Sequence, residues 1–192
     1  MNERTFRPER AHKLEDPERQ KWLPLSAVIE RLSLHSGMVV ADVGAGTGYF
    51  AFPIARTVAP GMVYAVDSQP PMLALMKEKL PNESVENVVL VSGEAEATTL
   101  PTASCDLVLM ANVWHELDDH EAVLGEMNRI LKAEGVLAIL DWRHDVATPP
   151  GPPLQHRVAM TTVLSLLRSQ GWTATDAREL GTYSYLVLSS HL

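Results

Sequence analysis

The sequence predicts an α/β protein built on an open, doubly wound and mostly parallel sheet with helices on both faces. Two observations support this fold class, and a third concerns the number of domains. Short apolar runs of strand length alternate along the chain with segments whose apolar residues recur at helical spacing. Strand, helix and strand follow one another four times, an order typical of a parallel sheet with right-handed crossovers. The length of 192 residues favours one domain over two complete cores.

Residues 1–21 differ in composition from the rest of the chain. They hold six basic and five acidic side chains, two prolines and one aromatic residue, without an amphipathic period. We therefore expect an N-terminal arm or flap, followed by a single domain over residues 22–192. Apolar side chains recur at helical spacing from Trp22 until His35, Ser36 and Gly37 end a first helix.

Five apolar runs are the predicted strands of the sheet. They are apolar throughout rather than alternating, which indicates parallel strands buried on both faces. Cys105 lies in the fourth run, and we interpret it as a core residue because it is the only cysteine and cannot form a disulfide within the chain. The runs lie at residues 38–43, 62–66, 88–91, 105–110 and 136–140.

Three helices are predicted between these strands. Pro70 and Pro71 suit the first turn of a helix, and Pro53 lies early enough in another to be tolerated. The third helix carries one stripe of apolar side chains, and Asp118 with Glu121 forms its predicted capping box. The helices are expected at residues 48–58, 70–80 and 118–132.

The last part of the chain departs from this alternation. Four prolines around Gly151 predict a long loop after the fifth strand, and Gly171 ends the helix that follows it. Two strand-like runs flank Gly181, and so short a link predicts an antiparallel hairpin. The expected elements are a helix over residues 154–170 and strands over 172–179 and 183–189.

Charge and hydropathy exclude two classes of partner. The formal net charge is -8, and residues 80–128 hold ten acidic side chains with no Lys or Arg, so a nucleic-acid backbone would be repelled there. No apolar run reaches the ~20 residues that span a bilayer, and the first residues lack the apolar core of a signal peptide. We expect a cytoplasmic protein with no membrane span and no nucleic-acid partner.

The sharpest functional signal is the stretch VVADVGAGTGYF. A predicted strand runs directly into Gly44, Gly46 and Gly48, and glycines there let the backbone approach a ligand closely. A dinucleotide fingerprint would need glycine where this chain has Tyr49. Asp67 ends the second strand, where a carboxylate can accept hydrogen bonds from both hydroxyls of a ribose. The pattern indicates a ligand that contains a nucleoside and fits a nicotinamide poorly.

Motif by motif, the chain resembles the Rossmann-like class I methyltransferases that depend on S-adenosylmethionine, especially the type 11 group that includes quinone-biosynthesis enzymes. VADVGAGTG at 40–48 is similar to their first motif, VYAVDSQPPML at 63–73 to their second and SGEAEATTLP at 92–101 to their adenine-side loop. Two later segments, CDLVLMANVWHEL and NRILKAEGVLAILDW, are similar to their fourth and fifth, although KAEGVL replaces the usual Pro-Gly-Gly turn. The resemblance implies seven strands in the order 3-2-1-4-5-7-6 with the last antiparallel, S-adenosylmethionine as methyl donor, S-adenosylhomocysteine as product and a small-molecule acceptor.

The resemblance also assigns cofactor-binding roles. The glycine loop would pass under the methionine part with Asp42 holding its amino group, while Asp67 would bind the ribose. Glu94, where the family often has aspartate, would face the adenine amino group, with Met72 over the ring and Asn112 beside the sulfonium. The full set of expected cofactor-binding residues is Asp42, Gly44, Ala45, Gly46, Gly48, Asp67, Ser68, Met72, Gly93, Glu94, Ala95 and Asn112.

The methyl acceptor is expected beyond the carboxyl ends of the strands, where open α/β sheets bind ligands. Methyl transfer from a sulfonium depends on alignment and exclusion of water, and needs a general base only if the acceptor arrives protonated. His115, His144 and His156 are the candidate bases, and His115 leads because it follows the fourth strand directly. Each also has a structural interpretation: bracing the loop, facing solvent and capping the next helix, respectively. The other expected side chains of this mixed aromatic and polar pocket, suited to a small aromatic or heteroatom acceptor, are His12, Lys13, Trp114, Glu116, Trp142, Arg143, Asp145 and Arg157.

Several alternatives stay open on the sequence. No metal site is expected, because the spacing of His144, Asp145 and His156 matches no compact ligand motif. A non-catalytic cofactor-binding or partner protein would keep the glycine loop, and a nicotinamide-dependent oxidoreductase would share the fold. Monomer and homodimer are both compatible with an exposed edge of the terminal hairpin. Trp22, Trp172 and two tyrosines fall on helix or strand periods, which is typical of core residues.

Overall fold

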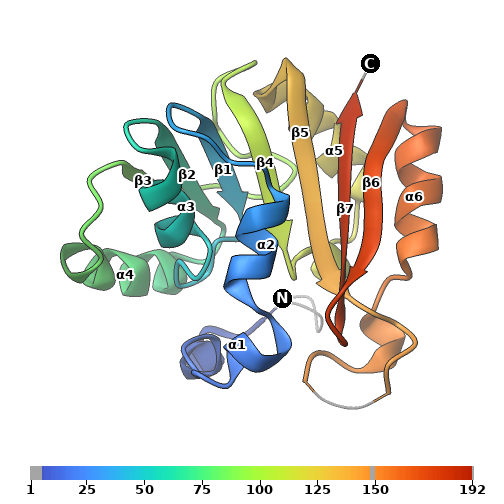
Figure 1. Cartoon of the computed structure of the whole chain (residues 1–192), viewed down its shortest axis with the longest axis horizontal. Coiled ribbons are helices and arrows are strands. Elements are labelled where there is room, and N and C mark those ends of the chain that lie inside the picture. The colour runs from blue at the N-terminus through green and yellow to red at the C-terminus, as the bar shows by residue number, and fades with distance from the viewer. Residues whose placement is uncertain (1–5, 148–149, 192) are drawn as a thin grey trace.

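The computed structural model of the chain describes residues 6–147 and 150–191. It contains one seven-stranded sheet in the order β3-β2-β1-β4-β5-β7-β6, with helices on both faces (Figure 1). The pairs among β1 to β5 are parallel, and β7 runs antiparallel to both β5 and β6. The predicted fold class and strand order are therefore confirmed. The strands are β1 Val39–Val43, β2 Met62–Asp67, β3 Val88–Ser92, β4 Cys105–Ala111, β5 Leu131–Trp142, β6 Trp172–Leu180 and β7 Ser184–His191.

Two apolar layers lie on the two faces of the sheet. Alternate residues of each central strand enter opposite layers: Val40 packs on one face and Ala41 on the other. The helices α2 Leu25–Arg31, α3 Ala51–Val58 and α4 Pro70–Lys79 contribute to the first layer. The helices α5 His120–Ile130 and α6 Met160–Ser169 cover the second, in which Cys105 is buried as predicted. Burial on both faces explains why these strands are apolar throughout.

Several element boundaries differ from the sequence-based expectation, including that of the helix expected from Trp22, which begins at Leu25 as α2. The N-cap of α5 is Asp119, whose Oδ1 accepts a hydrogen bond from the Ala122 N–H at 3.0 Å. The predicted capping box of Asp118 and Glu121 is therefore wrong, because the helix begins one residue later and Ala122 occupies the position where a capping box needs Glu or Gln. β5 begins at Leu131, directly after α5, and includes the segment KAEGVL, where its pairing with β4 is irregular. α3 begins at Ala51, three residues after the predicted start.

The helix predicted over residues 154–170 forms only in its second part. A short 3-10 helix, η4 Leu154–His156, is followed by extended backbone at Arg157, and α6 begins at Met160. The guanidinium of Arg157 donates to four main-chain carbonyls of the preceding loop, which holds this residue against the loop instead of in a helix. One of the four prolines that predicted the loop, Pro149, lies outside the described residues.

The N-terminal segment forms short helices over the carboxyl ends of the strands. These are η1 Pro8–Leu14 and α1 Arg19–Trp22, although the sequence shows no amphipathic period there (Figure 1). Residues 1–5 of the predicted arm lie outside the described part of the chain. Movement of this arm, and the division of the chain at residue 22, stay predictions. Within residues 6–147 and 150–191, no helix combines the length and apolar character needed to cross a membrane.

Candidate active site

A cavity of about 860 Å³ lies at the carboxyl ends of β1, β2 and β4. Doubly wound sheets bind their ligands at this edge, and the volume is in the range of small-molecule pockets. The N-terminal segment and residues 150–153 form part of its wall. Every expected cofactor-binding residue except Gly48 lines the cavity.

The glycine loop after β1 forms the floor of this cavity. Gly44 has a φ of +76°, and a Cβ there would lie 2.3 Å from a methyl carbon of Val113. Gly46 also has a positive φ, of +55°. Side chains at these positions would be strained and would separate the loop from a ligand. Gly48 has a different role, because a Cβ there would lie 2.5 Å from the Phe52 ring of α3, away from the cavity.

Asp67 fixes the glycine loop to the end of β2. Its Oδ2 accepts a hydrogen bond from the Gly46 N–H at 2.8 Å, and its Oδ1 accepts one from the Gln69 N–H at 2.9 Å. Burial raises the pKa of Asp67, and these two hydrogen bonds oppose that effect. Only 7% of the residue is exposed, and it lines the cavity beside Ser68. Each carboxylate oxygen can accept more than one hydrogen bond, so Asp67 keeps capacity for two ligand hydroxyls.

Three buried polar atoms at the cavity have no hydrogen-bond partner among the described residues. They are Arg19 Nε, Asp42 Oδ2 and Asn112 Oδ1. Burial, and then the nearby charge of Asp67, raises the pKa of Asp42 to about 7. Asn112 also has a φ of +59°, an uncommon value for a residue with a side chain. Buried polar groups are rarely unpaired in proteins, so this end of the cavity fits a ligand with several polar groups.

Another part of the cavity wall suits a flat apolar ring. Met72 extends from α4 and is buried, and the loop after β3 brings Gly93, Glu94 and Ala95 to the wall. Gly93 leaves no room for a side chain, because a Cβ would lie 2.8 Å from the Thr98 carbonyl oxygen. The Glu94 side chain is exposed at the rim, where a carboxylate can meet an exocyclic amino group.

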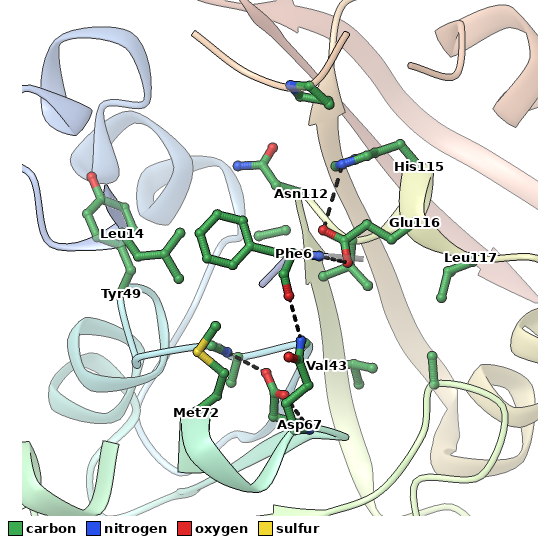
Figure 2. A pocket seen from close by; sticks show the side chains of 18 of the residues that line it. Phe6, Leu14, Val43, Tyr49, Asp67, Met72, Asn112, His115, Glu116 and Leu117 are labelled. Atoms are coloured by element: carbon green, nitrogen blue, oxygen red, sulfur yellow. Dashed lines mark hydrogen bonds and ion pairs between the residues drawn. The ribbon is translucent and has the colours of Figure 1, made fainter. Parts of the chain in front are cut away.

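His115 lies beside the cavity between two acidic side chains. Its Nδ1 is 2.8 Å from Asp141 Oδ1, and its main-chain N–H donates to Asp141 Oδ2 at 2.8 Å. Its Nε2 is 3.8 Å from Glu116 Oε1 (Figure 2). Burial disfavours the charged imidazole, but the charge and hydrogen bond of Asp141 outweigh burial, so the pKa of His115 is raised. This arrangement orients a proton acceptor toward the cavity.

Phe6 spans the cavity between the ends of β2 and β4 (Figure 2). Its N–H donates to Glu116 Oε2 at 3.0 Å, and its carbonyl accepts a hydrogen bond from Gln69 Nε2 at 3.0 Å. Burial raises the pKa of Glu116 to about 7, although the Phe6 hydrogen bond opposes the rise. The N-terminal segment is thereby tied to both halves of the site.

The comparison with known protein families identifies the family to which the chain belongs. Residues 41–139, just over half of the chain, match the family described as the methyltransferase domain. The chain belongs to this methyltransferase family. The predicted resemblance is confirmed, and the cofactor that the family implies is S-adenosylmethionine. The unpaired atoms of Asp42 and Asn112, together with Asp67, fit the amino acid and ribose parts of that cofactor.

The similar proteins include a solved structure of a methyltransferase dependent on S-adenosylmethionine from Aquifex aeolicus. It is 30% identical with a TM-score of 0.93, and the match covers 98% of this chain and 100% of that one. A demethylmenaquinone methyltransferase from Geobacillus stearothermophilus is 30% identical over 59% of this chain and 49% of its own length. The protein of the same name from Staphylococcus aureus strain Newman is 33% identical over 59% of this chain and 47% of its own length. The chain spans about half the length of these curated relatives.

The other two candidate bases, His144 and His156, differ in their position relative to the cavity. His144 is exposed and does not line the cavity, because it lies in the loop where Arg143 pairs with Asp145. His156 does line the cavity, at the end of η4. It does not cap α6, whose N-cap is Ala159. The structure therefore gives an exposed position for His144 and a position at the cavity wall for His156.

The aromatic and polar residues expected at the acceptor side divide into two groups. Trp142 and Lys13 line the cavity, and Trp142 stacks on Trp22 with 5.2 Å between ring centroids. Trp22 thus packs against the core, as its helical spacing in the sequence predicts. It also lines the cavity, which that spacing did not indicate. Trp114 instead is fully buried beneath the sheet, and Arg157 is occupied by loop carbonyls.

Sequence reasoning assigned no role to three residues that complete the site: Asp141, Arg19 and Phe6. The sequence could have predicted Asp141 as a site residue, because Asp141 follows the apolar run of β5 just as Asp67 follows that of β2. Arg19 and Phe6 lie in a segment without a period, and no local signal marks them. Across residues 6–147 and 150–191, no group of three or more His, Cys, Asp or Glu side chains is arranged to hold a metal ion.

Proposed function

We propose that this chain is an enzyme that transfers a methyl group from S-adenosylmethionine to a small-molecule acceptor by in-line displacement. The observation that carries the proposal is the single cavity that combines Asp67, the glycine loop and unpaired Asp42 at one end with the His115–Asp141 pair at its side. The first group suits the cofactor, and the second suits an acceptor that must lose a proton.

The proposed cofactor site uses the residues named from the resemblance. Asp67 accepts hydrogen bonds from the ribose hydroxyls, Asp42 accepts them from the amino group, and Asn112 lies beside the sulfonium. Met72 and the wall at Gly93 to Ala95 enclose the adenine ring. When bound, S-adenosylmethionine supplies a methyl group that its positive sulfur has already activated. The protein then contributes alignment and exclusion of water.

His115 acts as the general base in this proposal. The carboxylate of Asp141 holds the ring proton on Nδ1, which leaves Nε2 free to accept a proton from the acceptor. Glu116 lies 3.8 Å from Nε2 and stabilises the imidazolium when its own carboxyl is ionised. His156 is a second base candidate at the wall of the cavity.

We propose a flat acceptor with an ionisable oxygen, nitrogen or carbon. The walls of the cavity that His115 lines include Phe6, Trp22 and Trp142, which offer flat apolar surfaces for such a ring. The names of two bacterial relatives specify demethylmenaquinone, and a related aromatic acceptor is the first to assay.

The test is transfer of an isotopically labelled methyl group from S-adenosylmethionine to a cell extract separated into small-molecule, protein and nucleic-acid fractions. We expect label in the small-molecule fraction with the unmodified chain and much less with His115→Ala. Label in protein or nucleic acid would overturn the proposed acceptor class. No transfer, with S-adenosylmethionine binding demonstrated separately, would favour a non-catalytic binding protein.

A further inference from the structure

Arg19 is a buried cation at the wall of the cavity. It lies in α1, and only 6% of the residue is exposed. Its Nη1 donates to the Leu14 carbonyl at 3.1 Å, and the guanidinium carbon lies 4.0 Å from the centre of the Tyr49 ring. Its Nε has no partner among the described residues. Buried arginines are normally fully paired, so this guanidinium still lacks an acceptor for its Nε–H.

Asp42 is the matching buried anion. It is the residue before the last one of β1, 2% of it is exposed, and its Oδ2 is also unpaired among the described residues. The charge of Arg19 lowers the pKa of Asp42, and the charge of Asp42 raises the pKa of Arg19. The two side chains nevertheless form no ion pair in the described structure. Two opposite charges therefore face one cavity, and each has an unused hydrogen-bonding atom.

An α-amino acid group satisfies both residues at once. Its ammonium and carboxylate share one carbon atom, so they can meet an anion and a cation that lie close together. A ligand with only one of these charges would leave the other buried residue unpaired, which is costly. The planar guanidinium, with one face against Tyr49, presents N–H donors along its edge as a carboxylate requires.

We propose that Arg19 binds the carboxylate of the methionine part of S-adenosylmethionine while Asp42 binds its amino group. The inference rests on the proposed function. Arg19 lies outside residues 41–139, the part that matches the family, and it lines the cavity, so the proposal extends the cofactor site to the N-terminal segment. The same segment is held to the glycine loop through Glu15, which contacts the Thr47 hydroxyl and pairs with Lys79. Lys79 in turn donates to the Thr47 carbonyl at 2.9 Å.

The decisive experiment compares ligands with and without the amino acid group. Calorimetric titration would use S-adenosylhomocysteine and 5′-methylthioadenosine, which keeps the adenosine and sulfur but lacks the amino acid. We expect Arg19→Met to weaken S-adenosylhomocysteine about 10- to 100-fold, as loss of a charged hydrogen bond does. Binding of 5′-methylthioadenosine should change less than about twofold. Arg19→Lys keeps the charge but loses the planar pair of donors, so its affinity for S-adenosylhomocysteine should lie between those of the unmodified chain and Arg19→Met.

A second comparison does not depend on whether Arg19→Met folds. The unmodified chain should bind decarboxylated S-adenosylmethionine about 10- to 100-fold more weakly than S-adenosylmethionine, because the carboxylate that Arg19 would bind is missing. The role of Arg19 would be overturned if Arg19→Met lost affinity equally for S-adenosylhomocysteine and 5′-methylthioadenosine. Equal affinity of the unmodified chain for S-adenosylmethionine and its decarboxylated form would also overturn it. Failure of the unmodified chain to bind any S-adenosyl ligand would instead overturn the proposed function.

Discussion

Asp141 holds His115 at two points, through the imidazole ring and through the main chain. Oδ1 lies 2.8 Å from the ring Nδ1, while Oδ2 accepts the main-chain N–H of the same residue at 2.8 Å. Asp141 is fully buried at the end of β5, and His115 follows the neighbouring strand β4. One carboxylate thus fixes the ring orientation and the loop that carries the ring.

Asp141→Asn is expected to change the pH dependence of turnover as well as its size. The charge of Asp141 raises the pKa of His115, so its removal lowers that pKa and moves the acidic limb of the kcat profile to lower pH. Turnover at the optimum should fall about 10- to 100-fold, because the ring loses its fixed tautomer. An acidic limb that stays in place would mean that Asp141 serves only the fold.

His115→Ala should lower turnover about 100-fold or more while S-adenosylhomocysteine affinity changes little, because the base acts on the acceptor. His144→Ala is the matched control, since His144 is exposed outside the cavity. Steady-state kinetics and calorimetry would measure both quantities. Equal turnover in the two variants would remove His115 from the chemistry.

Cofactor binding is expected to release a proton near neutral pH. The pKa of Asp42 is about 7 without a ligand, mainly because the carboxyl is buried. An ammonium group beside it favours the charged form and lowers that pKa. Affinity for S-adenosylhomocysteine should therefore fall as the pH drops below 7, by at most about tenfold per pH unit.

Calorimetry in two buffers with different ionisation enthalpies would measure this proton release directly. Asp42→Asn should abolish the difference between the buffers. A buffer-independent heat in the unmodified chain would mean that Asp42 does not meet the ligand's amino group.

Gly44→Ala should impair both folding and cofactor binding. The new Cβ would lie 2.3 Å from Val113 at a φ of +76°, a strain of about 1–3 kcal/mol. Gly125→Ala is the matched control, because Gly125 is exposed in α5 with no atom within 4 Å of a Cβ. That change should raise the free energy of unfolding by about 0.5–1 kcal/mol. Thermal unfolding and ligand titration would distinguish the two, and tolerance of Gly44→Ala would mean that the loop does not require glycine there.

The sheet, and the positions of the glycine loop and Asp67 at its edge, were predictable because their signals are local. Strands buried on both faces must be apolar throughout, and the loop between β1 and α3 must contain glycine at Gly44 to avoid Val113. Asp67 lies at the end of its strand, so its position at the sheet edge follows from the fold class alone.

The remaining features depend on contacts between distant parts of the chain. Phe6 is placed by Glu116 and Gln69, and Arg19 by the Tyr49 ring, none of which a periodic pattern reveals. The late start of α6 reflects the Arg157 side chain, which binds loop carbonyls from Arg143 to Pro152. The N-cap is Asp119 and not the predicted Asp118, because two adjacent aspartates offer equivalent capping groups and the sequence alone does not distinguish them.

The most direct test of the whole account is calorimetric titration of the unmodified chain and of Asp67→Ala with S-adenosylmethionine, S-adenosylhomocysteine and NAD. Asp67 holds Gly46 and faces the cavity, so its loss removes the proposed ribose contact and loosens the glycine loop. We predict micromolar binding of both sulfur ligands, a loss of at least about tenfold in Asp67→Ala, and no binding of NAD. Binding of NAD instead, or no binding of either sulfur ligand, would contradict the proposed cofactor site and the enzyme activity built on it.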